Sequence, residues 1–411
     1  MKVFSTLEPA TRRNLLLLFA VGLLFWASLA ALLPTLPLYI RDVGGTKSQI
    51  GVVMGAFAVG LLLFRPWLGQ LADRRGRQVV LLIGLVAAAI APLGYLVTQS
   101  MPLLIAVRAF HGLSIAAFTT AYSTLVVDLS PPSNRGEVIG YMSLVNPVGV
   151  AIGPAIGGFL QEWAGYTPLF LLSTGLGVVG FVGALWIQAP VPVAQPIAST
   201  SKTTLWRLLW SPRLRTPTLT LMLAGMAFGV LSTFVPLFIQ EAGVNLNAGL
   251  FYTAAAVASF SVRLLTGRAS DRHGRGRFIT LGLLLYAVTM LLLWSARSTD
   301  VFLLAGLLEG AGIGIFLPLM IALVADRSEA HERGRVFSLC VGGFDLGIAI
   351  AGPTLGLFAE QIGYRGLFGL SSGLVFLSVI VFVTQSSKTL SQSLRFAFGE
   401  GRDFYALPHG K

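Results

Sequence analysis

The stretch Gly69-Gln70-Leu71-Ala72-Asp73-Arg74-Arg75-Gly76-Arg77 decides the fold of this chain, because it returns 198 residues later as Gly267-Arg268-Ala269-Ser270-Asp271-Arg272-His273-Gly274-Arg275. Further residues recur at the same offset. They are Arg65 and Arg263, Asp128 and Asp326, Arg135 and Arg333, Gly136 and Gly334, Gly165 and Gly363, and Tyr166 and Tyr364. Repeated agreement at one offset indicates an internal duplication.

The composition places both copies in a membrane. Of the 411 residues 55% are hydrophobic and only 11% are charged, against about 25% charged in a soluble domain. Uncharged apolar runs of roughly 17 to 25 residues predict membrane-spanning helices. Their approximate limits are 14–40, 48–68, 78–98, 102–128, 137–160, 167–188, 216–240, 247–266, 278–296, 300–325, 335–358 and 366–384. The sequence therefore predicts an all-α membrane protein with twelve spans.

The repeat divides these spans into two bundles. Because six spans separate the copies, both copies have the same orientation, as in a parallel repeat about an axis along the membrane normal. We expect an N-terminal six-helix bundle at 1–188, a cytoplasmic central loop at 189–215, a C-terminal six-helix bundle at 216–384 and a cytoplasmic tail at 385–411. The central loop contains a predicted interfacial amphipathic segment at 205–210.

The distribution of basic residues predicts the orientation. Of the 29 Lys and Arg residues, 24 lie on the side of the two termini, four lie on the other side, and Arg108 lies within a span. Lys and Arg accumulate on the cytoplasmic side of membrane proteins. Both termini are therefore expected in the cytoplasm, and the net charge of +12 needs no nucleic-acid partner to explain it. The single cysteine, Cys340, excludes an intrachain disulfide.

Three motifs resemble the major facilitator superfamily. The loop 69–77 followed by Gln78 is similar to the family's GxLaDrxGrr loop, and 108–112 (RAFHG) is similar to its RxxxG motif. In span five, 149–158 (GVAIGPAIGG) is similar to the GxxxGPxxGG motif of the drug:proton antiporters. Many multidrug members have an acidic residue in span one, and this chain has none there.

The resemblance implies a fold and a location. It implies two six-helix bundles around a central cavity, lined by spans one, four, seven and ten and flanked by spans two, five, eight and eleven. It also implies a multi-pass protein of the cell (inner, cytoplasmic) membrane that acts as a monomer. In this fold substrate is carried by alternating access between the two halves.

The repeated loops have a physical interpretation of their own. We expect Asp73 to cap the start of a helix, the glycines to permit a tight turn, and Arg77 to reach Asp128 at the end of span four. Such charged pairs can hold the cytoplasmic helix ends in one conformation. The predicted conformational-switch residues are Gly69, Asp73, Gly76, Arg77 and Asp128, with their copies Gly267, Asp271, Gly274, Arg275 and Asp326.

The span-five motif predicts close helix packing. Gly149, Gly153 and Gly157 recur every four residues and form a smooth groove on one helix face. Pro154 is expected to bend the helix, and Gly158 completes the motif.

Ionisable residues within the spans are costly and indicate function. Arg108 and His111 lie three residues apart in span four. Glu309 in span ten occupies the repeat position of His111, and Asp345 lies in span eleven. At about 1.5 Å per residue the two acids fall near the membrane midplane. We expect Glu309, Asp345 and His111 to be candidates for proton coupling and Arg108 to be the charge of the cavity.

The motifs favour transport over catalysis. The chain has no GxxxxGK[ST] loop, no HExxH pair and no Cys/His metal cluster, so it is not expected to be an enzyme or to need a metal or cofactor. The main hypothesis is a proton-coupled antiporter that exports small amphipathic or apolar compounds. An exporter of a sugar, siderophore or lipid is the alternative, and an importer is a weaker one. Expected partners are the substrate, protons and the lipid bilayer. Weaker candidates for lining the substrate site are Trp26, Asn146, Phe228 and Phe344.

Overall fold

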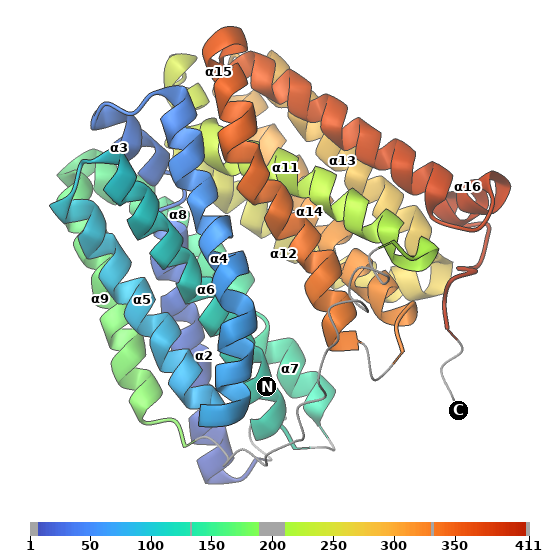
Figure 1. The fold of residues 1–411 in the computed structure, drawn as a ribbon, viewed down its shortest axis with the longest axis horizontal. Coiled ribbons are helices and arrows are strands. Elements are labelled where there is room, and N and C mark those ends of the chain that lie inside the picture. The colour runs from blue at the N-terminus through green and yellow to red at the C-terminus, as the bar shows by residue number, and fades with distance from the viewer. Residues whose placement is uncertain (1–6, 132–133, 189–209, 330–332, 408–411) are drawn as a thin grey trace. The chain divides into compact units, whose positions relative to one another are not determined.

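The computed structural model describes residues 7–131, 134–188, 210–329 and 333–407, and over these ranges the regular structure is entirely helical (Figure 1). The N-terminal helices are α2 (Pro9–Ala31), α3 (Leu36–Asp42), α4 (Lys47–Arg75), α5 (Arg77–Val97), α6 (Met101–Leu129), α7 (Arg135–Met142), α8 (Val145–Ala164) and α9 (Tyr166–Leu185). The C-terminal helices are α11 (Pro212–Glu241), α12 (Ala248–His273), α13 (Arg275–Ser295), α14 (Thr299–Asp326), α15 (Arg333–Gln385) and α16 (Leu390–Phe398).

These helices form two compact units. One contains Met1–Ile197 and Asn247–Thr253, and the other contains Ala198–Leu246 and Ala254–Lys411. In the first unit α2 packs on α8 and α9, and α6 packs on α4 and α5. In the second unit α11 packs along α15, and α13 packs on α14 and α15. The predicted amphipathic segment at 205–210 lies almost entirely outside the described residues.

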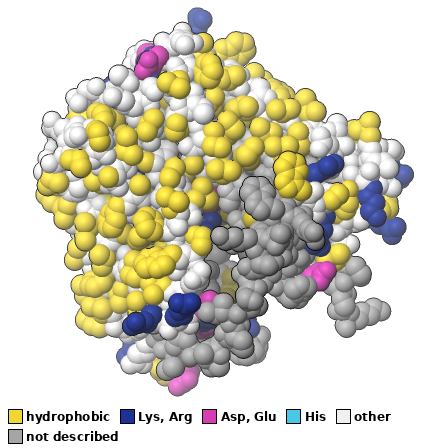
Figure 2. All heavy atoms as spheres, in the orientation of Figure 1, with side chains coloured by type: hydrophobic (Ala, Val, Ile, Leu, Met, Phe, Trp, Pro, Cys, Tyr) yellow, Lys and Arg dark blue, Asp and Glu magenta, His cyan; other side chains and the backbone are white. Residues whose placement is uncertain are grey.

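The helices are long and apolar enough to cross a membrane. Among the described residues eleven such segments occur, counting α2 with α3 and α7 with α8. The last of them contains two predicted spans, because α15 is interrupted at Gly363, where φ is 69° and ψ is 174°. Large hydrophobic side chains such as Leu63, Val97 and Leu265 are strongly exposed, and Figure 2 shows apolar side chains spread over the visible surface. Such a surface suits contact with lipid.

The first span is interrupted, whereas its sequence indicates one continuous helix. Helix α2 ends at Ala31 and α3 begins at Leu36. Pro34 lies in the break, where its missing N–H cannot continue the helical hydrogen bonds. Pro37 lies in the first turn of α3, a position that proline favours. Span five is similarly divided into α7 and α8 at residues 143–144.

The sequence repeat is repeated in the helix packing. Glycine has no Cβ atom, and this absence lets neighbouring helices approach closely. A Cβ added to Gly84 would contact Phe118 of α6, and one added to Gly282 would contact Phe316 of α14, 198 residues further on. The turns that join the helices recur as well. Gly76 and Gly274 have φ of 96° and 87°. Because L-residues with a side chain rarely adopt positive φ, these turns require glycine.

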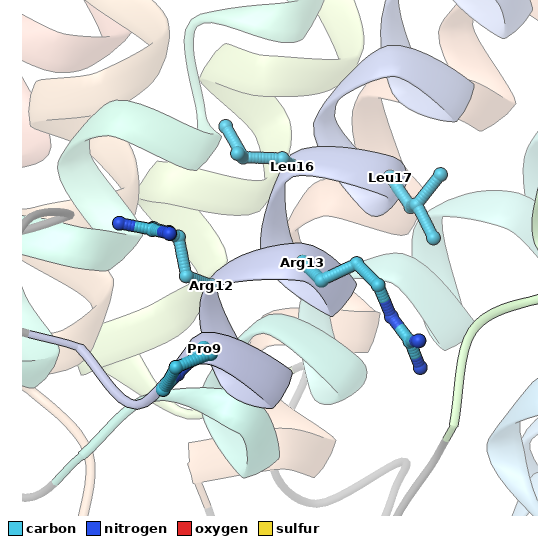
Figure 3. A pocket seen from close by; sticks show the side chains of 5 residues that line it. All are labelled: Pro9, Arg12, Arg13, Leu16 and Leu17. Carbon is cyan, nitrogen blue, oxygen red and sulfur yellow. The ribbon is translucent and has the colours of Figure 1, made fainter.

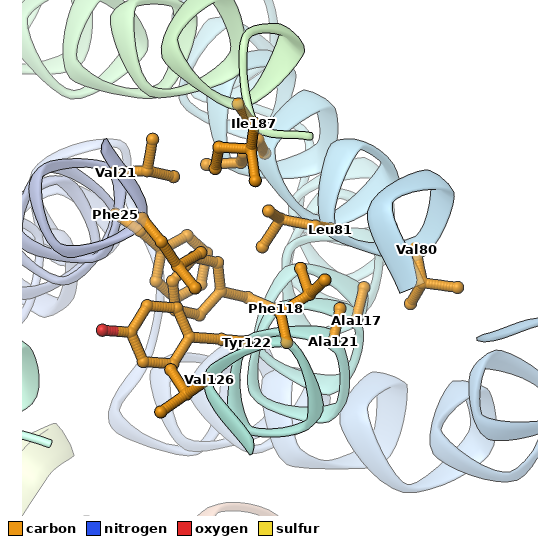
Figure 4. Close-up of a cluster of buried hydrophobic side chains, with 14 of the residues drawn as sticks. Val21, Phe25, Val80, Leu81, Ala117, Phe118, Ala121, Tyr122, Val126 and Ile187 are labelled. Atoms are coloured by element: carbon orange, nitrogen blue, oxygen red, sulfur yellow. The ribbon is translucent and has the colours of Figure 1, made fainter. Parts of the chain in front are cut away.

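The core of the N-terminal unit lies between α2, α5 and α6 (Figure 4). The rings of Phe25 and Phe118 are stacked with centroids 3.8 Å apart, and Tyr122 stacks on the other side of this pair at 5.1 Å from Phe118. Val21, Leu81 and Ile187 close the cluster from neighbouring elements. This packing holds α6, which carries Arg108 and His111, against its neighbours.

Candidate functional site

The four ionisable residues predicted to lie deep in the spans are all buried. Arg108 and His111 lie on α6, Glu309 lies on α14 and Asp345 lies on α15. The first two belong to the N-terminal unit and the other two to the C-terminal unit. The structure therefore brings Arg108 and His111 together and places Glu309 and Asp345 on separate helices of the other unit. A cavity shared by all four stays a prediction.

Arg108 and His111 form a compact cluster with two residues of neighbouring helices. The hydroxyl of Tyr95 on α5 lies 3.1 Å from His111 Nδ1, and Arg108 Nη1 lies 3.5 Å from the same atom. The Arg108 guanidinium lies 4.3 Å from the centre of the Phe57 ring on α4, a cation–π contact. The Phe57 ring also meets the His111 ring edge to face at 5.6 Å. The Arg108 charge is thus packed among the helices of its own bundle.

Close backbone packing holds this cluster in place. A Cβ on Gly112 would overlap the carbonyl oxygen of Phe57, and a Cβ on Gly60 would overlap that of Ala109. These glycines let α4 and α6 approach closely. The Tyr39 hydroxyl donates a 2.6 Å hydrogen bond to the carbonyl oxygen of Tyr95 and fixes α5 at the same level. The glycine of the RAFHG motif therefore positions the arginine and histidine that precede it.

Two polar atoms of the cluster are buried without a hydrogen-bond partner. Arg108 Nε and His111 Nε2 are buried and have no hydrogen-bond partner. Among the described carboxylates of the N-terminal unit, none lies within ion-pair distance of Arg108. A buried cation without a carboxylate partner is costly in a low-dielectric environment. An anionic group that reached this cluster would lower that cost.

Glu309 has a different neighbour in the C-terminal unit. A Cβ on Gly312, one turn along α14, would lie 3.0 Å from the backbone nitrogen of Tyr286 on α13. The Tyr286 hydroxyl is buried without a hydrogen-bond partner, and Tyr286 is close enough to Glu309 for an electrostatic interaction. No basic side chain pairs with Glu309 among the described residues of this unit. Glu309 is thus a buried carboxyl within electrostatic range of a tyrosine on the neighbouring helix.

Asp345 lies where α15 crosses α11. A Cβ on Gly225 would overlap the carbonyl oxygen of Phe344, and a Cβ on Gly347 would overlap that of Met222. The rings of Phe228 and Phe344 pack with centroids 5.6 Å apart. Of the residues predicted to line a substrate site, these two therefore contact each other. Trp26 packs edge to face on Phe25, and Asn146 is half-buried on α8.

The charged loops form an ion pair in each unit. Arg77 pairs with Asp128, and Arg275 Nη1 lies 2.5 Å from Asp326 Oδ2. Asp73 is an exposed residue in the last turn of α4, and α5 begins after Gly76 without a side-chain cap. The expectation that Asp73 caps a helix start is therefore wrong, because α4 continues to Arg75. Gly69 has open space around its Cα, and Gly267 and Asp271 lie on α12 with side chains outside the described set.

The span-five glycines face α2. A Cβ on Gly149 would lie 2.5 Å from Trp26 Cβ, and a Cβ on Gly153 would lie 2.7 Å from the carbonyl oxygen of Ala27. A Cβ on Gly157 would overlap the carbonyl oxygen of Ala31. The three glycines thus follow α2 over two turns. Pro154 and Gly158 are buried in the same helix.

The sequence does not predict the structure around residues 386–407. Arg327 is completely buried, and its Nε and Nη2 atoms donate hydrogen bonds of 2.7 and 3.0 Å to the two carboxylate oxygens of Asp403. Its Nη2 also donates to the carbonyl oxygen of Ser386, and its Nη1 donates to that of Arg213. The tail is therefore fixed to the helix ends of the C-terminal unit.

The sequence analysis also does not predict roles for Tyr95 and Tyr286, although a tyrosine within an apolar span is a usable signal.

A shallow surface hollow of about 380 Å³ lies at the start of α2 (Figure 3). It is lined by Pro9, Arg12, Arg13, Leu16 and Leu17, all from the first turns of this one helix. None of the buried ionisable residues contributes to it. It is not the candidate site.

The fold and the buried ionisable residues define a polytopic helical membrane protein. Comparison with known proteins then gives the family. The model of the Major Facilitator Superfamily matches residues 18–269 and 246–399. The chain therefore belongs to the Major Facilitator Superfamily, as its motifs predicted, and is a multi-pass membrane transporter rather than an enzyme.

Curated relatives extend over most of the chain. The Staphylopine export protein of Staphylococcus aureus is 26% identical over 374 residues, covering 89% of this chain and 94% of its own. Multidrug resistance protein MdtG of Serratia proteamaculans is 25% identical, with coverage of 90% and 92%. Quinolone resistance protein NorA of Staphylococcus aureus is 31% identical over 166 residues, which are 40% of this chain and 42% of its own.

Solved structures share the fold. The nucleoside transporter NupG superposes with a TM-score of 0.78 at 14% identity, covering 89% of this chain and 98% of its own. The human organic anion transporter MFSD10 gives a TM-score of 0.64 at 20% identity, with coverage of 91% and 100%. The predicted arrangement of twelve spans in two repeats is thus confirmed.

Proposed function

We propose that this protein exports small amphipathic or apolar compounds in exchange for protons, with Glu309 as the principal proton-binding group. The observation that carries the proposal is the burial of this carboxyl in an apolar helix, beside Tyr286 and without a basic partner among the described residues of its unit. An unpaired carboxylate is unfavourable away from water. A carboxyl that is alternately closed off from water and hydrated can therefore take up and release a proton in each cycle.

The relatives support the direction of transport. The printed names of three relatives describe export or drug resistance. The GVAIGPAIGG motif on α8 points to the same group of antiporters. We infer that Asp345 and His111 assist Glu309. Trp26, Asn146, Phe228 and Phe344 are proposed to contact the substrate.

The two loop ion pairs are proposed to act as switches. Arg77 with Asp128, and Arg275 with Asp326, join the first turn of one helix to the end of another within each unit. Breaking and reforming such pairs would change the spacing of the helix ends during alternating access. With both termini in the cytoplasm, as the basic residues predict, these pairs would close the inner side.

A second candidate is the export of an anionic compound. It is supported by the Arg108 cluster, which has no carboxylate partner among the described residues of its unit. The Staphylopine export protein, which aligns over most of both chains, supports export. A substrate carboxylate would satisfy both the charge and the unused N–H groups. Competition by anionic compounds would favour this candidate over apolar drugs.

The test uses purified protein in proteoliposomes with an imposed pH difference. Glu309→Gln should retain downhill substrate exchange and lose pH-driven accumulation. Asp300→Asn is the matched control, because Asp300 is an exposed acid in the first turn of the same helix. Accumulation that persists in Glu309→Gln, Asp345→Asn and the double variant would reject both acids as coupling groups.

A further inference from the structure

Helix α16 is a defined helix fixed to the C-terminal unit. Thr389 caps its start by accepting a hydrogen bond of 3.3 Å from the Gln392 backbone, and Gly399 ends it in the left-handed conformation with φ of 87°. Phe396 is buried against Phe382 of α15. Thr280 of α13 donates a 3.0 Å hydrogen bond to the carbonyl oxygen of Ala397. One face of α16 is thus occupied by the protein.

A second face of α16 is apolar and uncovered. Leu390, Leu394 and Phe398 are 58%, 37% and 58% exposed. At about 100° per residue these three side chains occupy one stripe, directly beside the buried face that contains Ser393, Phe396 and Ala397. This stripe would be unfavourable in water.

Basic residues lie in the last turn of α16 and on either side of the helix. Lys388 and Arg395 are exposed, and so is Arg402, whose guanidinium lies 4.9 Å from the Phe404 ring. Glu400 is the exposed acid of this segment. Figure 2 shows basic side chains gathered at the end of the C-terminal unit where Figure 1 places α16. Cations beside an apolar stripe are typical of helices that lie at a membrane surface.

The position of α16 along the chain makes a lipid surface available. Helix α15 ends at Gln385, and α16 begins only five residues later. Gly276, in the first turn of α13, approaches Phe396 so closely that a Cβ would overlap its carbonyl oxygen. The helix therefore lies beside the ends of two membrane-length helices.

We propose that α16 is a membrane-surface element that binds anionic phospholipid. Leu390, Leu394 and Phe398 enter the interface between acyl chains and headgroups. Lys388, Arg395 and Arg402 bind the phosphate groups of the lipids. The buried face stays on α13 and α15, so that lipid contact bears directly on the helices that carry Arg275 and Asp345.

The experiment places an environment-sensitive fluorophore on α16 of the full-length protein. The background is Cys340→Ser, because Cys340 is buried and accepts a hydrogen bond from Thr218 that serine can also accept. A nitrobenzoxadiazole label is attached at Leu394→Cys, in the middle of the apolar stripe, or at Ser391→Cys, which is exposed and lies about 60° further round the helix toward Arg395. Each protein is placed singly in nanodiscs of phosphatidylcholine alone or mixed with phosphatidylglycerol.

The expected result is quenching of the label at 394 by brominated lipid and quenching of the label at 391 by iodide in water. Brominated phosphatidylglycerol should quench the label at 394 more than brominated phosphatidylcholine does. Replacing Lys388, Arg395 and Arg402 by Gln should remove this preference, with about a fivefold loss of anionic-lipid enrichment for each charge.

Three outcomes would overturn the proposal. Equal iodide access at 394 and 391 would show that the stripe lies in water. Protection of 394 without quenching by lipid would show that protein covers it, and equal quenching by the two lipids would remove the anionic specificity. If Leu394→Cys releases α16, as detected by trypsin, the same measurements are made with Phe398→Cys.

Discussion

Replacing Asp403 by Asn should release the C-terminal segment, residues 386–407, without unfolding the membrane helices. Arg327 is completely buried and donates hydrogen bonds of 2.7 and 3.0 Å to Asp403. Its guanidinium also makes cation–π contacts with the rings of Phe396 and Tyr405 in the same segment. Removing one partner of a buried ion pair costs about 3–5 kcal/mol. We expect the lower end, about 3 kcal/mol, because the Asn oxygen still accepts one hydrogen bond.

The released population can be measured by proteolysis. Since each 1.4 kcal/mol is about a factor of ten, the population of released segment should rise on the order of a hundredfold. Trypsin cleaves after Arg395, which is exposed but lies within α16 in the native state. When reclosing is faster than cleavage, the cleavage rate follows the released population.

The matched control is Glu400→Gln, which removes an exposed acid of the same segment and leaves Arg327 paired. Its cleavage rate should equal that of the parent protein. Replacing Arg327 by Met together with Asp403 by Leu removes both charges and should restore much of the protection, because no buried charge is left unpaired. Equal cleavage rates for Asp403→Asn and Glu400→Gln would refute the reasoning.

Three further predictions concern the switch, the packing and the orientation. Asp326→Asn should reduce transport severalfold with little change in thermal stability, because its pair with Arg275 is only partly buried and contributes about 1 kcal/mol or less; unchanged transport would argue against a switch. Gly157→Leu should abolish turnover and lower the free energy of unfolding by at least about 1–3 kcal/mol, because the larger side chain overpacks against α2. Gly175→Leu, at a glycine with open space around it, should leave transport and melting temperature unchanged. With Cys340 replaced by Ser, a cysteine at Ser391 should react with a membrane-impermeant maleimide only after cells are permeabilised, and labelling of intact cells would reverse the predicted orientation.

The sequence alone determined the features that depend on short stretches of chain or on the internal repeat. Apolar run length predicted the spans, because a helix must satisfy its backbone hydrogen bonds within itself to cross lipid. The offset of 198 residues predicted the two repeats, and the recurrence of Arg77 with Asp128 as Arg275 with Asp326 identified residues that the structure pairs in both units. Burial of Arg108, His111, Glu309 and Asp345 followed from their position within apolar runs.

Only the tertiary structure decided which side chains these residues meet. Tyr95 contacts His111 and Phe57 contacts Arg108, and both partners come from other helices. These contacts depend on how the helices are rotated and how closely glycines let them approach. The pair of Arg327 and Asp403 joins residues 76 positions apart and occurs in one half of the repeat, so neither periodicity nor duplication predicts it. Local sequence fixes whether a segment is helical and apolar, whereas the partner of a buried charge is set by the path of the whole chain.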